Sequence, residues 1–283
     1  MRLFPAPIRS ILVHLDASAA CAVRLHLARQ LAEQLGAGVT ALFAVAPGSS
    51  GLPTSFSAAA IASAAQTLDI DGRHHARAAL ERAVSHGGPA VAWQESVAEA
   101  PLHALSRHAL LADLLVLGKR DPGGPHAEQL PPDFAESVVI ASGKPALVVP
   151  DNAPAGDLGR TITIAWKPSR ESARAVAAAL PLLQRAQAVH LLMWQDKQEA
   201  APAAHHLGQL AAFLQRHGVV AQTHPLGAAP SRIGDAILAE ARRHGADLLV
   251  MGCYGRSRAR EMLLGGASRS VLQAMRLPVL MAH

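Results

Sequence analysis

A seven-residue apolar segment occurs twice in the chain with a single change. Residues 112–118 read ADLLVLG and residues 246–252 read ADLLVMG, 134 positions apart. Each copy is followed at nearly the same distance by a proline and a short apolar run, which begin at Pro145 and Pro278. Self-similarity of this kind indicates a duplicated structural unit, so the 283 residues are predicted to form two related units in tandem.

The start of each unit also repeats, because Ile11–Ser18 matches Ile162–Ser169 at an offset of 151. In both copies buried-type strands alternate with helical stretches, an order typical of a parallel sheet covered on both faces. We therefore predict an α/β fold of two tandem doubly wound units, each an open five-stranded parallel sheet with about four helices. The predicted strands are 10–16, 39–45, 90–95, 113–118 and 146–149, then 161–166, 188–194, 219–225, 247–252 and 279–282. The predicted domains are 1–150 and 161–283, joined by a linker at 151–160.

Two smaller features refine this outline. The offset between the copies is shorter at their ends than at their starts, so the first unit holds extra residues, which we place in the Gly-, Ser- and Pro-rich stretch Pro47–Ala65. Ser18 and Ser169 stand where the first helix of each unit begins. A serine at that position can accept a hydrogen bond from an unpaired backbone N–H, so both are predicted to cap their helices.

Composition narrows the class of protein. Half of the residues are hydrophobic and 17% are charged, but no apolar run approaches the roughly 20 residues that a membrane helix needs. The two cysteines, Cys21 and Cys253, form no metal-binding or disulfide pattern, and we expect a cytoplasmic protein. The net charge of +5 comes with few aromatic residues and no basic run, so neither nucleic acid nor a membrane is an expected partner.

One loop has the pattern of a phosphate site. The strand that ends at Gly252 is followed by Cys-Tyr-Gly255, nine residues, Gly265-Gly266-Ala-Ser268 and a helical stretch. Glycines allow the backbone to approach a phosphate, and a helix start offers unpaired N–H groups and a positive dipole end. Ser268 can add a hydroxyl. The arginines around the loop can pair with a polyphosphate or form a solvated basic face; they are Arg256, Arg258, Arg260 and Arg269.

These motifs resemble those of the universal stress protein family, over essentially the whole chain outside the linker. Nucleotide-binding members carry G-x2-G-x9-G-(S/T) between the fourth strand and the fourth helix, and Gly252, Gly255 and Gly265 match it. The position of the final Ser or Thr is Gly266 here, which leaves Ser268 as the nearest hydroxyl. The resemblance implies an adenine nucleotide, ATP, ADP or AMP, as the ligand.

The resemblance also implies where the base lies. The family places an aspartate at the end of the first strand, but the second unit has Trp166-Lys167 there, while the first unit has Asp16. The end of the next strand would hold the adenine edge, with Met193 and Trp194. In the first unit, Pro131–Ser137 occupies the place of the final glycine and serine. Its acidic residues, Asp133 and Glu136, would repel a phosphate.

Other chemistries have weaker patterns. The chain has 15 histidines, but the adjacent pairs on predicted helices, His74-His75 and His205-His206, point apart, so no metal site is expected. No Gly-x-Ser-x-Gly elbow occurs, Cys253 reads as a small filler or a redox residue, and no carboxylate is placed by a motif to hold Mg²⁺. An enzyme is not expected beyond slow incidental ATP hydrolysis.

The sequence thus predicts a cytoplasmic stress-response protein that binds an adenine nucleotide in its C-terminal unit and acts as a regulatory or signalling module on a protein partner. The alternative is a scaffold, or a binder of a non-nucleotide small molecule, whose ATP site is lost. Because single-unit relatives pair through their last strands, the resemblance implies a pseudo-twofold pairing of the two units within one chain. A further homodimer stays open.

Overall fold

The computed structural model describes residues 8–16, 18–45, 58–85, 87–96, 99–119, 130–153, 156, 158–195, 201–254 and 266–283, with only the backbone for 58–69. The chain divides into two compact units, one formed by Ile8–Lys144 and the other containing Pro145–His283. The domain and linker bounds proposed from the sequence stay a prediction. Each unit is described by itself below.

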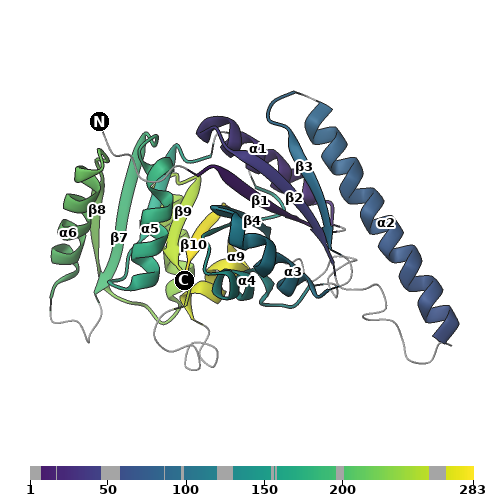
Figure 1. Ribbon diagram of the computed structural model, residues 1–283. Coiled ribbons are helices and arrows are strands. Elements are labelled where there is room, and N and C mark those ends of the chain that lie inside the picture. Colours follow the sequence, from purple (N-terminus) through teal and green to yellow (C-terminus); the bar gives the residue numbers. More distant parts are fainter. Residues whose placement is uncertain are drawn as a thin grey trace. The chain divides into compact units, whose positions relative to one another are not determined.

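The first unit alternates strands and helices around a parallel sheet with the strand order β3-β2-β1-β4. Helices α1 and α2 pack against each other, as do α3 and α4 (Figure 1). Strands β1 and β4 are buried along almost their whole length. The elements are β1 (Ser10–Leu15), α1 (Cys21–Leu35), β2 (Gly38–Ala44), α2 (Ala58–Ser85), β3 (Val91–Ser96), α3 (Pro101–His108), η1 (Ala109–Leu111), β4 (Leu114–Gly118) and α4 (Phe134–Ser142).

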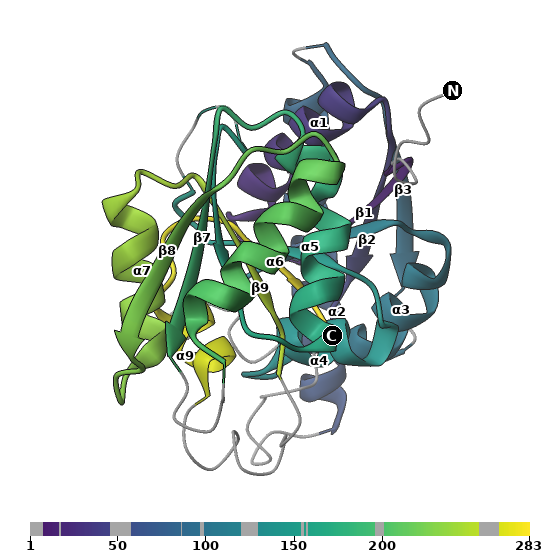
Figure 2. The same ribbon diagram turned by 90° about the vertical axis from the view of Figure 1, so that its left-hand side faces the viewer.

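The second unit repeats this plan with the strand order β8-β7-β6-β9-β10. All neighbours in this row are parallel, and β5 pairs antiparallel with β10 at the end of the row. Figure 2 shows α5 and α6 on one face of these strands and α7 and α9 on the other. The elements are β5 (Ala146–Val149), β6 (Thr161–Ala165), α5 (Arg170–Leu183), β7 (Ala188–Gln195), α6 (Ala203–Arg216), β8 (Gln222–Ala228), α7 (Ile233–Arg243), β9 (Leu248–Gly252), α9 (Ala267–Ala274) and β10 (Val279–Ala282).

The α/β class and all ten predicted strands are confirmed, the latter to within three residues. The largest difference is β8, predicted at 219–225 and found at Gln222–Ala228. This strand pairs only with β7 and exposes most of its residues, so it lacks the apolar signal of an inner strand. Strand β5 ends the first repeat of the sequence but pairs with β10, which is the pairing of last strands that the family resemblance implies.

The repeated ADLLV segment has the same structural role in both units. Asp113 accepts hydrogen bonds from the backbone N–H groups of Arg9 and Ser10, which lead into β1. Asp247 accepts from the N–H groups of residues 159, 160 and 161, which lead into β6. Each aspartate therefore satisfies backbone donors at the entry of the neighbouring central strand, and this explains why the aspartate recurs before an apolar strand.

The two predicted helix caps have different outcomes. The Ser169 hydroxyl accepts from the Ser172 N–H at 3.2 Å, as predicted. The prediction for Ser18 is wrong, because α1 has Ala20 at its N-cap, without a side-chain cap, and the Ser18 hydroxyl donates to Asp16 Oδ1. A carboxylate is the stronger acceptor for a serine hydroxyl. Among the helices in the described part of the chain, none has the length and apolarity to cross a membrane.

Candidate functional site

The predicted site residues meet at one edge of the second unit's sheet. Strand β6 lies between β9 and β7, and Ala165 pairs with both Met251 and Leu192. The residues that follow these three positions therefore leave the sheet side by side; they are Trp166-Lys167, Gly252 and Met193-Trp194. The strand order also reverses between β6 and β9. In open α/β sheets, ligands bind in the crevice at such a switch point, beyond the carboxyl ends of the strands.

Gly252 is required by the packing of α5 on the end of β9. A Cβ atom at this position would lie 2.7 Å from the backbone nitrogen of Ser172 and 3.0 Å from Glu171. Burial raises the pKa of the Glu171 carboxyl, but hydrogen bonds from Arg170, at 2.6 Å, from the backbone N–H of Glu171 and from Ser169 together outweigh burial and lower the pKa below its ordinary value. The first glycine of the motif therefore has a structural role that is independent of any ligand.

The two described ends of the glycine loop are tied together. The backbone N–H of Tyr254 donates to the Ser268 hydroxyl at 3.1 Å, and both residues are buried. Tyr254 has a φ of 48°, in the left-handed region that side-chain-bearing residues seldom adopt. Strain of this kind often occurs at ligand sites. Ser268 thus holds the beginning of the loop at the start of α9.

Helix α9 begins at this point with a start that suits an anion. Gly266 is its N-cap residue, no side chain in the described part of the chain caps the helix, and its first turn contains no acidic residue. The first N–H groups of a helix have no partner within the helix, and the dipole makes this end positive. The neighbouring Arg269 is exposed. Gly255, Arg256 and Gly265, which the sequence also places in the site, lie outside the described residues.

The candidate residues at the ends of β6 and β7 differ in burial. Lys167 is exposed, Met193 is buried and Trp194 is half-buried. Trp166 borders a pocket of ≈ 250 Å³ between α5 and α6, and its buried indole N–H has no hydrogen-bond partner among the residues that the structure describes. The pocket is lined by Trp166, Pro168, Ala173, Val176, His206, Gln209, Leu210 and Phe213. An apolar pocket with one free donor suits a small aromatic or apolar group that carries an acceptor.

The equivalent crevice of the first unit is filled by its own side chains. The fully buried Arg24 donates to the His14 carbonyl at 3.0 Å and to Asp16 at 2.6 Å. A Cβ on Gly118 would lie 2.8 Å from the same guanidinium. Burial raises the pKa of the Asp16 carboxyl, but the charge and hydrogen bond of Arg24, together with His14 and the Ser18 hydrogen bond, outweigh burial and hold the pKa well below its usual range.

The acidic residues that the sequence singles out in the first unit stand at the start of α4. Asp133 is the N-cap residue, and Glu136 is buried in the first turn. Two carboxylates at a helix start complement its positive end and repel a phosphate. The start of α4 therefore has the negative charge that the sequence predicted to repel a phosphate.

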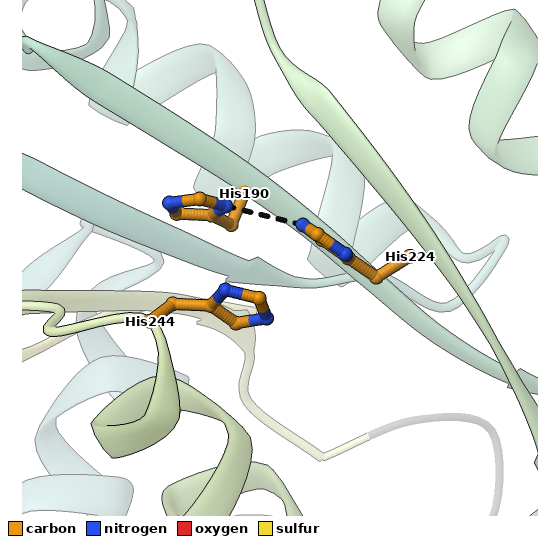
Figure 3. A group of neighbouring side chains, drawn as sticks. All are labelled: His190, His224 and His244. Atoms are coloured by element: carbon orange, nitrogen blue, oxygen red, sulfur yellow. Dashed lines mark hydrogen bonds between the residues drawn. The ribbon is translucent and has the colours of Figure 1, made fainter.

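The sequence reasoning missed two groups of residues. Arg24 has no motif around it, and only the fold brings it to the ends of β1 and β4. The other group is His190, His224 and His244, whose ring nitrogens lie within 4.8 Å of one another (Figure 3). These residues are 34 and 20 positions apart, so no short motif links them. The signal that could have found them is strand pairing, because His190 and His224 both fall in strands predicted from the sequence, and these two strands are paired. Cys253 is fully buried, which suits the filler interpretation.

Comparisons with known proteins agree with this description. Residues 159–283 match the model of the universal stress protein family. A universal stress protein from Archaeoglobus fulgidus DSM 4304 is similar over 96% of this chain and 95% of its own, with 16% identity and a TM-score of 0.67. A protein from Pseudomonas aeruginosa UCBPP-PA14, provisionally assigned to the same family, covers 96% of this chain and 92% of its own at 17% identity, with a TM-score of 0.59. These two likenesses show the fold across both units. No curated protein matches.

Proposed function

We propose that the second unit, whose residues 159–283 match the model of the universal stress protein family, binds an adenine nucleotide, and that the protein is a cytoplasmic regulatory module of the stress response. ATP, ADP and AMP are the proposed ligands, without a dedicated Mg²⁺ site. The proposed role is binding and signalling to a protein partner, with at most slow hydrolysis of ATP.

One observation carries this proposal: a glycine-led helix start at the switch point of the sheet, tied to the end of β9. The Tyr254–Ser268 hydrogen bond brings the strand end and the helix start together, and with Gly266 at the N-cap the first N–H groups of α9 have no side-chain cap among the described residues. A phosphate placed there would accept from these groups and gain from the helix dipole. The strained Tyr254 at the same point supports the view that the geometry serves a ligand.

The base and ribose would lie toward the ends of β6 and β7. Lys167 stands where the family's aspartate would be, so a hydroxyl of the ribose has no carboxylate to donate to at that position. Lys167 is exposed and its ammonium can reach an anion. We therefore propose that phosphate contacts dominate affinity, and that discrimination among bases is weak.

Titration calorimetry of the full chain with ATP and with AMP tests the proposal, and the informative variant is Gly266→Asp. An aspartate at the N-cap accepts from the first N–H groups of α9 and stabilises the helix by a few tenths of a kcal/mol to about 1 kcal/mol. It also places a carboxylate where the phosphate would bind. We expect affinity to fall at least tenfold while thermal stability is kept or raised.

Gly266→Asn is the matched control, because it caps the helix with a neutral amide. Its affinity should fall less than that of Gly266→Asp, since only the charge differs. No heat and no thermal shift with the unmodified protein at millimolar nucleotide would refute nucleotide binding. Equal affinity of Gly266→Asp and the unmodified protein would place the ligand elsewhere on the chain.

The second candidate function is binding of a non-nucleotide small molecule, and the pocket beside Trp166 favours it. A cavity of ≈ 250 Å³ is small compared with the about 300–1,000 Å³ of pockets for larger ligands, which suits a single ring. A fluorescence screen of aromatic acids against Trp93→Phe/Trp194→Phe protein, in which Trp166 is the remaining tryptophan, tests this. Quenching by such a compound without any nucleotide response would favour the second candidate.

A further inference from the structure

Three histidines meet on one face of the second unit's sheet. His190 lies in β7 and His224 in the adjacent strand β8, where His224 pairs with Leu192, two residues after His190. Paired residues of neighbouring strands point to the same face, as do residues two apart in one strand. His190 and His224 therefore share a face, and His244 reaches them from the C-terminal end of α7. Figure 3 shows the three rings turned toward one another.

The distances between the ring nitrogens are close to those between the ligand atoms of a metal site. His190 Nδ1 and His224 Nε2 are 3.1 Å apart, and one ring nitrogen from each histidine lies within 4.8 Å of the others. In a tetrahedral zinc site with Zn–N bonds of ~2.0–2.1 Å, the ligand nitrogens are separated by about 3.4 Å. The His244 ring is now stacked on His190 at 4.3 Å between centroids, so a rotation of this side chain would complete the set.

A carboxylate stands beside the histidines. Glu240 precedes His244 by four residues at the end of α7, and its Oε2 lies 3.6 Å from His244 Nε2. Both atoms are buried, and neither makes a hydrogen bond to any residue that the structure describes. Arg243 Nε is also 3.6 Å from Glu240 Oε2, but the Arg243 side chain is 67% exposed and can turn to solvent. Glu240 therefore offers an acceptor with unused capacity, as a fourth ligand or as the partner that orients His244.

The surroundings of His190 and His224 favour the neutral ring that a metal needs. Burial and the mutual proximity of the rings lower the pKa of His190 and of His224 below the ordinary value. Neutral imidazoles offer lone pairs at neutral pH without the loss of a proton. His224 and His244 are only half-buried, so an ion can reach them from solvent.

We propose that His190, His224 and His244 form a binding site for a divalent transition-metal ion of the Zn²⁺ class, with Glu240 as the adjacent carboxylate. Three imidazoles and a carboxylate suit Zn²⁺, Co²⁺ or Ni²⁺ and not Mg²⁺ or Ca²⁺, which prefer oxygen ligands. Metal binding at this site does not depend on nucleotide binding, and an experiment can refute either proposal alone. The competing interpretation is a stacked cluster of neutral histidines that serves packing only.

Titration of the chelator-treated full chain with Co²⁺ tests the proposal. We expect one equivalent to bind with the visible absorption of a low-symmetry tetrahedral or five-coordinate ion, and one equivalent of Zn²⁺ to remove that absorption. His224→Gln should weaken Co²⁺ binding at least 100-fold. His205→Gln is the matched control, because His205 is an exposed histidine of α6 beside His206, and it should leave the affinity unchanged.

Folding and background binding are controlled separately. Thermal melting of metal-free His224→Gln, followed by circular dichroism, shows whether the variant folds, and His244→Gln replaces it if it does not. With the unmodified protein, Co²⁺ affinity no tighter than millimolar would overturn the proposal. So would equal affinity in the folded His224→Gln and His205→Gln variants, because binding would then come from other histidines.

Discussion

The two units differ most at the ends of their central strands, where each sheet opens a crevice. In the first unit the guanidinium of Arg24 fills this place and pairs with Asp16. The residue at the same offset in the second unit is Ala175, and Lys167 stands at the position of Asp16. There the backbone at the start of α5, rather than a side chain, approaches Gly252.

The helices that follow β4 and β9 also differ between the units. Helix α4 begins with Asp133 and Glu136, whereas α9 begins with Gly266 and no acid in its first turn. One unit thus closes its crevice with an internal ion pair and covers its helix start with negative charge. In the other unit, no side chain of the described residues caps the helix start. A shared fold does not imply a shared site, and here the difference depends on a few side chains at the switch point.

The largest effect should come from opening the closed crevice with Arg24→Met. This change leaves the Asp16 carboxylate buried and without its cation, and losses of about 3–5 kcal/mol are typical when one partner of a buried pair is removed. The free energy of unfolding of the first unit, measured by urea denaturation, should fall by this amount. Arg24→Met/Asp16→Asn should lose less, because no buried charge remains. A loss under ~1 kcal/mol in the single variant would show that the pair does not stabilise the first unit.

The second prediction is that the free energy of unfolding depends on pH through His14, a residue of the first unit. Burial lowers the pKa of His14 to about 4, so below pH 6.5 the unfolded chain takes up a proton that the folded unit does not. The free energy of unfolding therefore falls as the pH falls, by about 2 kcal/mol between pH 7 and pH 5. Denaturation at both values, in unmodified protein and in His14→Phe, measures it. The variant should lose this part of the dependence and keep any part that comes from His190 and His224; identical pH profiles would contradict the assignment.

The third prediction compares the glycines that end β4 and β9. Gly118→Ala and Gly252→Ala should each destabilise by about 1–3 kcal/mol, because the added methyl has no room. In the first unit it meets the side chain of Arg24, and in the second the backbone of residues 171 and 172. Urea denaturation of Gly118→Ala in an Arg24→Met background should therefore show a smaller cost than in the unmodified protein. A cost that is unchanged would mean that Arg24 does not set the space at Gly118.

The fold was readable from the sequence because its signals are local and repeated. The ADLLV segments, the prolines before the last strands and the apolar runs predicted all ten strands and their class. The predicted strand bounds were least accurate for β8, which exposes most of its residues. Ser18 shows a second limit: α1 begins after Ala20, later than the spacing suggested, and the Ser18 hydroxyl donates to the Asp16 carboxylate instead; local patterns do not reveal such competition.

The site was only partly readable, for a different reason. Gly252, Gly266, Ser268, Trp166 and Lys167 could be placed because they follow strands or open a helix. The role of Gly252 in helix packing, the burial of Ser268 and the ion pair of Arg24 depend on contacts between distant segments. The three histidines depend on the register of β7 and β8, and no one-dimensional spacing contains that register.

The smallest effect tests the tie between strand and helix in the second unit. Ser268→Ala removes the hydroxyl that accepts from the Tyr254 N–H, and the loss of one buried hydrogen bond costs about 1 kcal/mol. Ser137→Ala is the counterpart in the first unit, where the hydroxyl donates to Asp133 in an exposed position, and it should cost less than about 0.5 kcal/mol. Thermal denaturation compares the two. If the Tyr254 strand end positions a ligand, Ser268→Ala should also weaken nucleotide binding in calorimetry, whereas Ser137→Ala should not; equal affinities would restrict Ser268 to a structural role.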